Sequence, residues 1–223
     1  MLTSSVQAPG QTALRITEIF YSIQGESQKV GLPTVFIRLT GCPLRCHYCD
    51  TAYAFYGGED ISIEAILQRV AGFNAQHVTV TGGEPLAQTN CLLLLKKLCD
   101  VGYQVSLETS GALDISEVDK RVMKVLDLKT PGSREEAKNR YDNIEYLLNS
   151  DQIKFVLCDR NDYEWTKGKI KELGLAKRCE ILFSPSHEEL DAATLADWIL
   201  EDRLPVRLQI QIHKYLWGNV RGK

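Results

Sequence analysis

The stretch VFIRLTGCPLRCHYCDT, residues 35–51, decides the fold of this 223-residue chain. Its first six residues form a short β-branched and apolar run, which predicts a buried strand. Three cysteines follow directly in the next loop, Cys42, Cys46 and Cys49, with C-x3-C-x2-C spacing. This spacing lets one loop wrap a single metal centre at the end of a strand.

The rest of the chain alternates short apolar runs with longer amphipathic ones. Strands are predicted at 35–40, 77–81, 103–109, 122–129, 152–157, 180–184 and 206–213. Helices are predicted at 62–73, with Ser62 as N-cap, and at 86–101, 134–149, 162–174 and 187–202. Such alternation indicates parallel strands joined by helices. About six to seven strands are too few for a closed eight-stranded barrel. We therefore expect one α/β domain over 1–223, an incomplete, open parallel β/α barrel with ligands at the carboxyl ends of its strands.

The composition excludes several classes of protein. The chain is 44% hydrophobic and 25% charged, with a formal net charge of -3, so it lacks the concentrated basic surface of a nucleic-acid-binding protein. No run approaches the roughly 18 apolar residues of a membrane span. The first 14 residues lack the basic and apolar regions of a signal peptide. We expect a cytoplasmic enzyme with no nucleic-acid or membrane partner.

The clustered thiols allow three kinds of site. Structural zinc needs four ligands, so His47 or a distant thiol would complete the shell. A redox pair would use Cys46 and Cys49 and leave Cys42 without a role. A four-iron four-sulfur cluster held by three thiolates would leave one iron open to a small molecule. The other four cysteines are predicted to be buried thiols: Cys91, Cys99, Cys158 and Cys179.

At this loop the sequence resembles the radical S-adenosylmethionine (SAM) superfamily, in which an aromatic residue, here Tyr48, precedes the last cysteine. TGGEP, residues 81–85, is similar to the turn that binds the methionine amino group in that superfamily. Its Gly82 and Gly83 would let the backbone approach a ligand and adopt positive φ. The resemblance implies a [4Fe-4S] cluster whose open iron binds SAM, and cleavage of SAM to a 5′-deoxyadenosyl radical.

Most of the chain resembles one family within that superfamily, the 7-carboxy-7-deazaguanine synthases, which are lyases of queuosine and deazapurine biosynthesis. The similar segments are 18–51, 107–111, 127–133 and 211–218. The resemblance implies hydrogen abstraction from C6 of 6-carboxy-5,6,7,8-tetrahydropterin, then Mg2+-dependent ring contraction with loss of ammonia. It also implies a flavodoxin or ferredoxin as electron donor and a homodimer. An activase of glycyl-radical enzymes and a non-catalytic zinc-binding module remain the alternatives.

The resemblance also assigns residues. An N-terminal extension over about 14–34 would bind substrate, and Thr51 would bind Mg2+. Substrate contacts would come from Ile23, Gln24, Gly25, Arg38, Thr81, His213 and Lys214. SAM contacts would come from Tyr48, Cys49, Asp50, Gly83, Ser110, Asp127, Leu128, Lys129, Phe183, Ser184, Pro185 and Ser186. A guanidinium such as that of Arg38 can bind a carboxylate bidentately; a solvated or ion-paired strand residue is the alternative interpretation. Glu108 and Lys129 could likewise form a buried ion pair.

The sequence departs from the family pattern at two places. Ser27 follows the QGE triplet where the family commonly has glycine, so the geometry of that turn is in question. The chain also continues through WGNVRGK, residues 217–223, whereas members of the family can end soon after the HKY motif. The resemblance assigns no role to this C-terminal tail.

Overall fold

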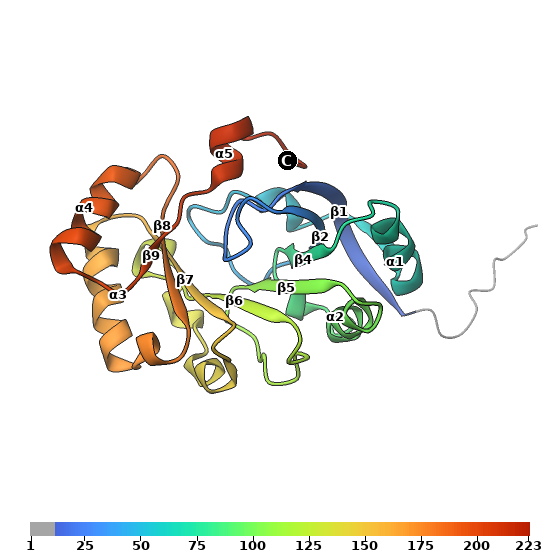
Figure 1. The fold of residues 1–223 in the computed structure, drawn as a ribbon, viewed down its shortest axis with the longest axis horizontal. Coiled ribbons are helices and arrows are strands. Elements are labelled where there is room, and N and C mark those ends of the chain that lie inside the picture. The colour runs from blue at the N-terminus through green and yellow to red at the C-terminus, as the bar shows by residue number, and fades with distance from the viewer. Residues whose placement is uncertain (1–11) are drawn as a thin grey trace, which may run out of the picture.

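The computed structural model describes residues 12–223. Residues 1–11 lie outside it, and with them most of the segment on which the signal-peptide prediction rests and the start of the predicted domain. One curved sheet of nine strands runs through the molecule (Figure 1). Its order is β3-β1-β2-β4-β5-β6-β7-β8-β9. The strands are β1 (Ala13–Ile23), β2 (Pro33–Leu39), β3 (Glu59–Ser62), β4 (His77–Gly82), β5 (Gln104–Thr109), β6 (Met123–Asp127), β7 (Gln152–Leu157), β8 (Glu180–Pro185) and β9 (Arg207–Leu208).

The strands from β2 to β9, apart from β3, pair in parallel, and each overlaps one of the seven predicted runs, although β2, β4 and β8 extend past its bounds by one or two residues. The predicted α/β open-barrel class is therefore confirmed. The α-helices are α1 (Ile63–Ala71), α2 (Cys91–Asp100), α3 (Arg160–Glu172), α4 (Ala192–Asp202) and α5 (Ile212–Trp217). Helix α2 packs against β5, α3 against β7 and α4 against β8, whereas α5 lies apart from these helices (Figure 1).

Local sequence explains where the helices begin. Ser62 has extended backbone and its side chain accepts a hydrogen bond from the N–H of Ala65, as the N-cap prediction requires. Asp159 and Asp191 cap α3 and α4 in the same way. The apolar faces of the helices and the inner residues of the strands form one continuous core that excludes water from the sheet.

Strands β1 and β3 were not predicted. Both are antiparallel, and β1 lies between β2 and β3. The alternation in β1 is clear only at Leu14 and Ile16, because the pairing with β2 shifts between Ile16 and Glu18. An extra residue at such a bulge reverses which side chains face the core, so the periodicity weakens in the sequence.

The helix predicted at 134–149 is wrong. The chain instead forms two short 3-10 turns, Glu136–Lys138 and Tyr141–Tyr146. Side-chain amides explain the difference: Asn139 bonds both the N–H and the carbonyl of Lys129, and Asn143 bonds the backbone of the loop after β5. The two amides hold the loops after β6 and β5. Hydrogen bonds of this kind, from a side chain to distant backbone, compete with formation of a regular helix.

The strand predicted at 206–213 is correct only for Arg207 and Leu208. Beyond them the chain leaves the sheet, because the Gln209 side chain accepts a hydrogen bond from Ser27 N–H at 2.7 Å. The N–H of Ile212 then donates to the carbonyl of Gly25, and α5 begins. Contacts with the N-terminal extension thus override the alternating pattern.

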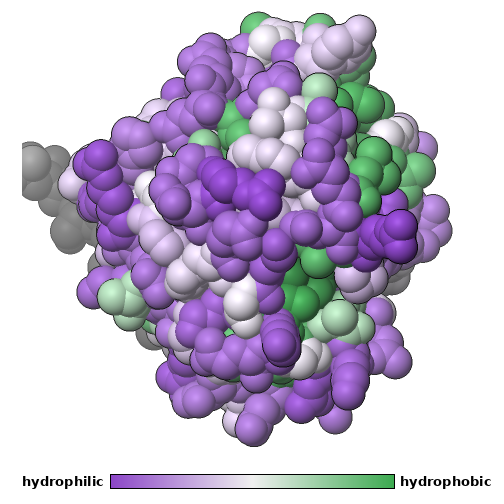
Figure 2. Space-filling model, turned by 90° about the vertical axis from the view of Figure 1, so that its left-hand side faces the viewer, coloured by the Kyte–Doolittle hydropathy of each residue, from purple (hydrophilic) through white to green (hydrophobic). Residues whose placement is uncertain are grey.

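The surface is mainly hydrophilic on the side shown in Figure 2, with separate hydrophobic areas. Within residues 12–223, no helix has both the length and the apolar character that a bilayer crossing requires.

Candidate active site

A cavity of about 240 Å3 lies at the carboxyl ends of the parallel strands. The loops after β2 and β4, together with the ends of β5 to β8, supply its walls, and residues 211–214 of the C-terminal segment line one side. All three thiols of the cysteine loop line this cavity. The sheet thus brings the cysteine loop and the TGGEP turn, which are some 40 residues apart in the sequence, to the same cavity.

Backbone contacts hold the cysteine loop. The N–H of Gly41 donates to the carbonyl of Ala54, and the N–H of His47 donates to the carbonyl of Ser133. Burial raises the pKa of Cys46 to about 11 and also raises that of Cys42. Metal binding therefore has to displace protons from these thiols. In the described part of the chain, no three His, Cys, Asp or Glu side chains converge as they would around a single ion.

The glycine turn packs directly on this loop. A Cβ on Gly83 would collide with the carbonyl of Gly41 and lie 2.9 Å from Cys42 Cβ. The expected positive φ is wrong, since neither Gly82 nor Gly83 has one. Close approach of two loops, and not backbone conformation, is therefore what requires glycine here.

Glu84 of the same turn joins a third loop. It is fully buried, and its carboxylate accepts hydrogen bonds from the hydroxyl of Thr109 and from the N–H and hydroxyl of Ser110. A buried carboxylate is stable only when such donors satisfy it. These bonds fix the loop after β5 against the loop after β4.

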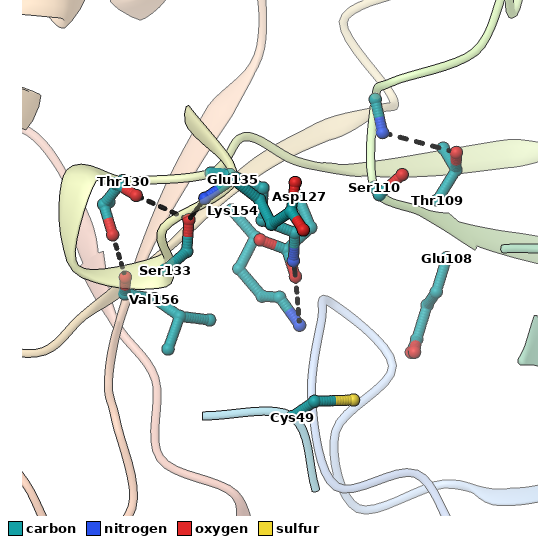
Figure 3. Close-up of polar contacts among 12 residues, drawn as sticks. Cys49, Glu108, Thr109, Ser110, Asp127, Thr130, Ser133, Glu135, Lys154 and Val156 are labelled. Atoms are coloured by element: carbon teal, nitrogen blue, oxygen red, sulfur yellow. Dashed lines mark hydrogen bonds and ion pairs between the residues drawn. The ribbon is translucent and has the colours of Figure 1, made fainter. Parts of the chain in front are cut away.

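Paired charges form the floor of the cavity. Lys154 Nζ lies 3.6 Å from Asp127 Oδ2 (Figure 3) and 2.7 Å from Glu26 Oε2. Lys129 Nζ lies 3.0 Å from Asp127 Oδ2. Burial alone would lower the pKa of Lys129, but Asp127 raises it above the usual range. For Glu26, burial opposes ionisation, yet the charge and hydrogen bond of Lys154 lower its pKa. Neighbouring opposite charges thus favour the charged forms of Lys129 and Glu26 in spite of their burial.

Glu108 behaves differently. It lines the cavity and accepts a hydrogen bond from the Thr81 hydroxyl at 3.2 Å. Burial, followed by the charge of Glu26, raises its pKa. The possible ion pair with Lys129 does not form, since Lys129 pairs with Asp127.

Three residues that line this cavity each carry a buried polar atom that makes no hydrogen bond to the described residues. These atoms are the hydroxyls of Tyr48 and Ser184 and Oδ1 of Asp127. An unsatisfied buried polar atom costs about 1–3 kcal/mol. All three therefore indicate a polar ligand in this part of the cavity, and three thiols lie beside it.

Most predicted site residues meet in this cavity. The predicted substrate residues all line it: Ile23, Gln24, Gly25, Arg38, Thr81, His213 and Lys214. So do Cys42, Cys46, Tyr48, Cys49, Asp50, Thr51, Gly83, Ser110, Asp127, Lys129, Ser184, Pro185 and Ser186. The structure does not bring Leu128 and Phe183 there, because both are fully buried in the core, with Phe183 packed edge-on against Phe155 and Tyr163.

Sequence reasoning missed Glu26, Lys154 and Gln211. Gln211 Nε2 donates to Glu26 at 2.7 Å and lies 3.3 Å from Asp50, so it joins the N-terminal extension to the cysteine loop. The only signal for Lys154 was a single charge within the apolar run QIKFVL. Such a charge needs a buried partner, and the sequence does not say where the partner lies.

Comparison with known proteins agrees with this geometry. Residues 36–130 match the Radical SAM superfamily model. A 7-carboxy-7-deazaguanine synthase from Chlorobaculum tepidum is 45% identical over 222 residues, which cover 98% of this chain and 99% of that protein. One from Koribacter versatilis is 40% identical over 92% of this chain and 97% of its own length.

A solved structure supports the fold. The crystal structure of QueE from Escherichia coli superposes with a TM-score of 0.75 at 24% sequence identity, and the match covers 89% of this chain and 94% of that one. At this identity the likeness concerns the fold alone. Together with the relatives that match over nearly the whole length, it shows that the chain is an enzyme of the radical SAM superfamily and belongs to the 7-carboxy-7-deazaguanine synthase family.

Proposed function

We propose that the chain converts 6-carboxy-5,6,7,8-tetrahydropterin to 7-carboxy-7-deazaguanine, with loss of ammonia. The observation that carries this proposal is a single cavity that combines three thiols, unsatisfied polar atoms and a floor of paired charges. A [4Fe-4S] cluster and SAM, when bound, would supply the radical chemistry for hydrogen abstraction from C6. The chain's own residues bind both molecules, orient them and exclude water.

Cys42, Cys46 and Cys49 would hold the cluster, because they are the only three cysteines that line the cavity in the described part of the chain. Tyr48, Asp127 and Ser184 would supply hydrogen bonds to SAM. Their free polar atoms fit a cofactor that carries ribose hydroxyls, an amino group and a carboxylate.

The substrate would lie on the side of the N-terminal extension, residues 14–34. Gln24 Nε2 bonds Thr79 at 3.0 Å, and its Oε1 accepts from the N–H of Glu26, so the amide is held in a fixed orientation. Arg38 presents a guanidinium for the substrate carboxylate. Burial lowers the pKa of His213, so its ring is neutral at neutral pH and can donate and accept one hydrogen bond each.

Thr51 would bind Mg2+. Its hydroxyl lies 3.8 Å from the sulfur of Cys49, at the border between the cluster side and the substrate side. Mg2+ prefers oxygen ligands and keeps several waters or substrate oxygens, so a single protein hydroxyl can hold it when substrate is present. The family also leads us to propose a flavodoxin or ferredoxin as electron donor, a homodimer and a cytoplasmic location.

The test is an anaerobic assay of iron-reconstituted protein with dithionite, SAM, Mg2+ and 6-carboxytetrahydropterin, followed by mass spectrometry. We expect the deazaguanine product. Cleavage of SAM without this product would contradict the substrate, and a glycyl-radical activase would then be the better interpretation. Zinc without iron or sulfide in anaerobically purified protein would contradict the cluster itself.

A further inference from the structure

Glu18 on β1 lies beside the cavity and belongs to none of the predicted site residues. Its Oε1 accepts hydrogen bonds from Arg38 Nε at 2.7 Å and from the Tyr53 hydroxyl at 2.8 Å. Its Oε2 faces Arg221 Nε at 3.3 Å. One carboxylate therefore joins β1, β2, the turn after the cysteine loop and the C-terminal tail.

These contacts fix the orientation of Arg38. Its Nε is its only nitrogen with a hydrogen bond to the described residues, so Nη1 and Nη2 keep their donors. The side chain is 13% exposed and lines the cavity, and its guanidinium carbon lies 5.9 Å from the ring centroids of both Phe20 and Tyr53. A guanidinium anchored through Nε presents its two Nη groups as a pair, which suits bidentate binding of a carboxylate.

Arg221 adds a positive charge to the pair formed by Glu18 and Arg38. With Arg38 alone, Glu18 would form a neutral pair and weaken the attraction for an anion. Arg221 also lies 4.0 Å from the centre of the Tyr53 ring and pairs with the other oxygen of Glu18. Two cations and one anion leave a net charge of +1, since 2 − 1 = 1.

We propose that Glu18 is a positioning residue for Arg38, and that Arg221 keeps this part of the cavity positive. Together they select a pterin that carries a carboxylate. The inference rests on the proposed substrate and assigns a role to the tail, which extends the established family activity.

The test compares two stable probes, 6-carboxypterin and unsubstituted pterin, by anaerobic titration calorimetry of reconstituted protein with SAM. Glu18→Ala is expected to weaken binding of 6-carboxypterin about tenfold, the loss typical of one charge-assisted hydrogen bond, and to leave pterin binding unchanged. Glu18→Gln keeps an oxygen for Arg38 Nε and removes a negative charge, so it should bind 6-carboxypterin at least as tightly as the parent, whereas Glu18→Ala loses the acceptor that orients Arg38. Arg221→Ala should also lose affinity for 6-carboxypterin alone, and Arg221→Lys should recover part of it.

Asp60→Asn is the matched control. Asp60, on β3, forms an exposed ion pair with Arg15, which lies on β1 as Glu18 does. It should change neither affinity. Equal loss of both probes in Glu18→Ala would mean a collapsed site and would overturn the inference, as would unchanged binding of 6-carboxypterin. If the parent protein bound neither probe, that result would contradict the proposed pterin substrate, and not only the roles of Glu18 and Arg221.

Discussion

Ser27 is the residue at which the sequence departs from its family, and the structure explains the departure. Its φ is +68°, a left-handed conformation that costs a residue with a Cβ about 1–2 kcal/mol. The residue is buried, its N–H donates to Gln209 and its hydroxyl accepts from the N–H of Lys29. Serine is tolerated because these hydrogen bonds offset part of the strain.

We therefore expect Ser27→Gly to be more stable than Ser27→Ala by about 1 kcal/mol, since both lose the hydroxyl and only alanine keeps the strain. Urea unfolding of the two variants measures the difference. The same pair of substitutions at exposed Lys120, whose φ is negative, should give the opposite order. Equal stability of the Ser27 pair would show that the turn relaxes.

Glu108 predicts a dependence of stability on pH. Burial raises its pKa in the folded protein, so the native state holds a proton that the unfolded chain releases above about pH 4.3. The free energy of unfolding therefore falls as pH rises from this value through the folded-state pKa. Glu108→Gln removes this fall.

Urea unfolding at pH 5, 6, 7 and 8 checks this expectation. The variant should gain stability relative to the parent as pH rises. Glu201→Gln on the exposed side of α4 is the control and should give a constant difference. A constant difference for Glu108→Gln as well would show that Glu108 is ionised throughout.

At the scale of elements, the close contact between the loops after β2 and β4 fixes the position of the cysteine loop. Gly83→Ala places a methyl group against the carbonyl of Gly41, so one of the two loops has to move. We expect a folded protein with less iron after reconstitution, measured by iron and sulfide content and circular dichroism. Gly168→Ala in α3 is the control: its Cβ meets no atom within 4 Å, and alanine should stabilise the helix by about 1 kcal/mol. Full iron content in Gly83→Ala would contradict the role of this contact.

The elements also show how far sequence reasoning reaches. The parallel strands and their helices follow from periodicity and caps, because each is dictated by residues close in sequence. The 134–149 and 206–213 segments could not be predicted, because Asn139, Asn143 and Gln209 bond to distant backbone. The motifs identified the thiols and the glycine turn. The carboxylates that pair with Lys154 and Arg38 lie elsewhere in the sequence, with Glu26 128 residues from Lys154 and Glu18 20 residues from Arg38, and no local pattern indicates them.

At the scale of the whole molecule, cofactor binding should stabilise the fold, because the cavity joins loops from most of the strands. A ligand that binds only the native state at 100 times its Kd adds about 2.7 kcal/mol. For a chain of this length this raises Tm by roughly 5–10 °C. Anaerobic thermal unfolding with and without SAM measures it, and Cys46→Ser, which lacks one of the three thiols proposed to hold the cluster, should show little increase. A similar rise in Cys46→Ser would mean that SAM binds without the cluster.

The cavity is completed by both ends of the described fold, with Gln24 and Glu26 on one side and Gln211 and Lys214 on the other. During synthesis the ribosome makes the cysteine loop early and residues 211–214 more than 150 positions later. The last wall of the cavity cannot form before then. The thiols of a nascent chain therefore lie in an incomplete cavity until residues 211–214 have been made.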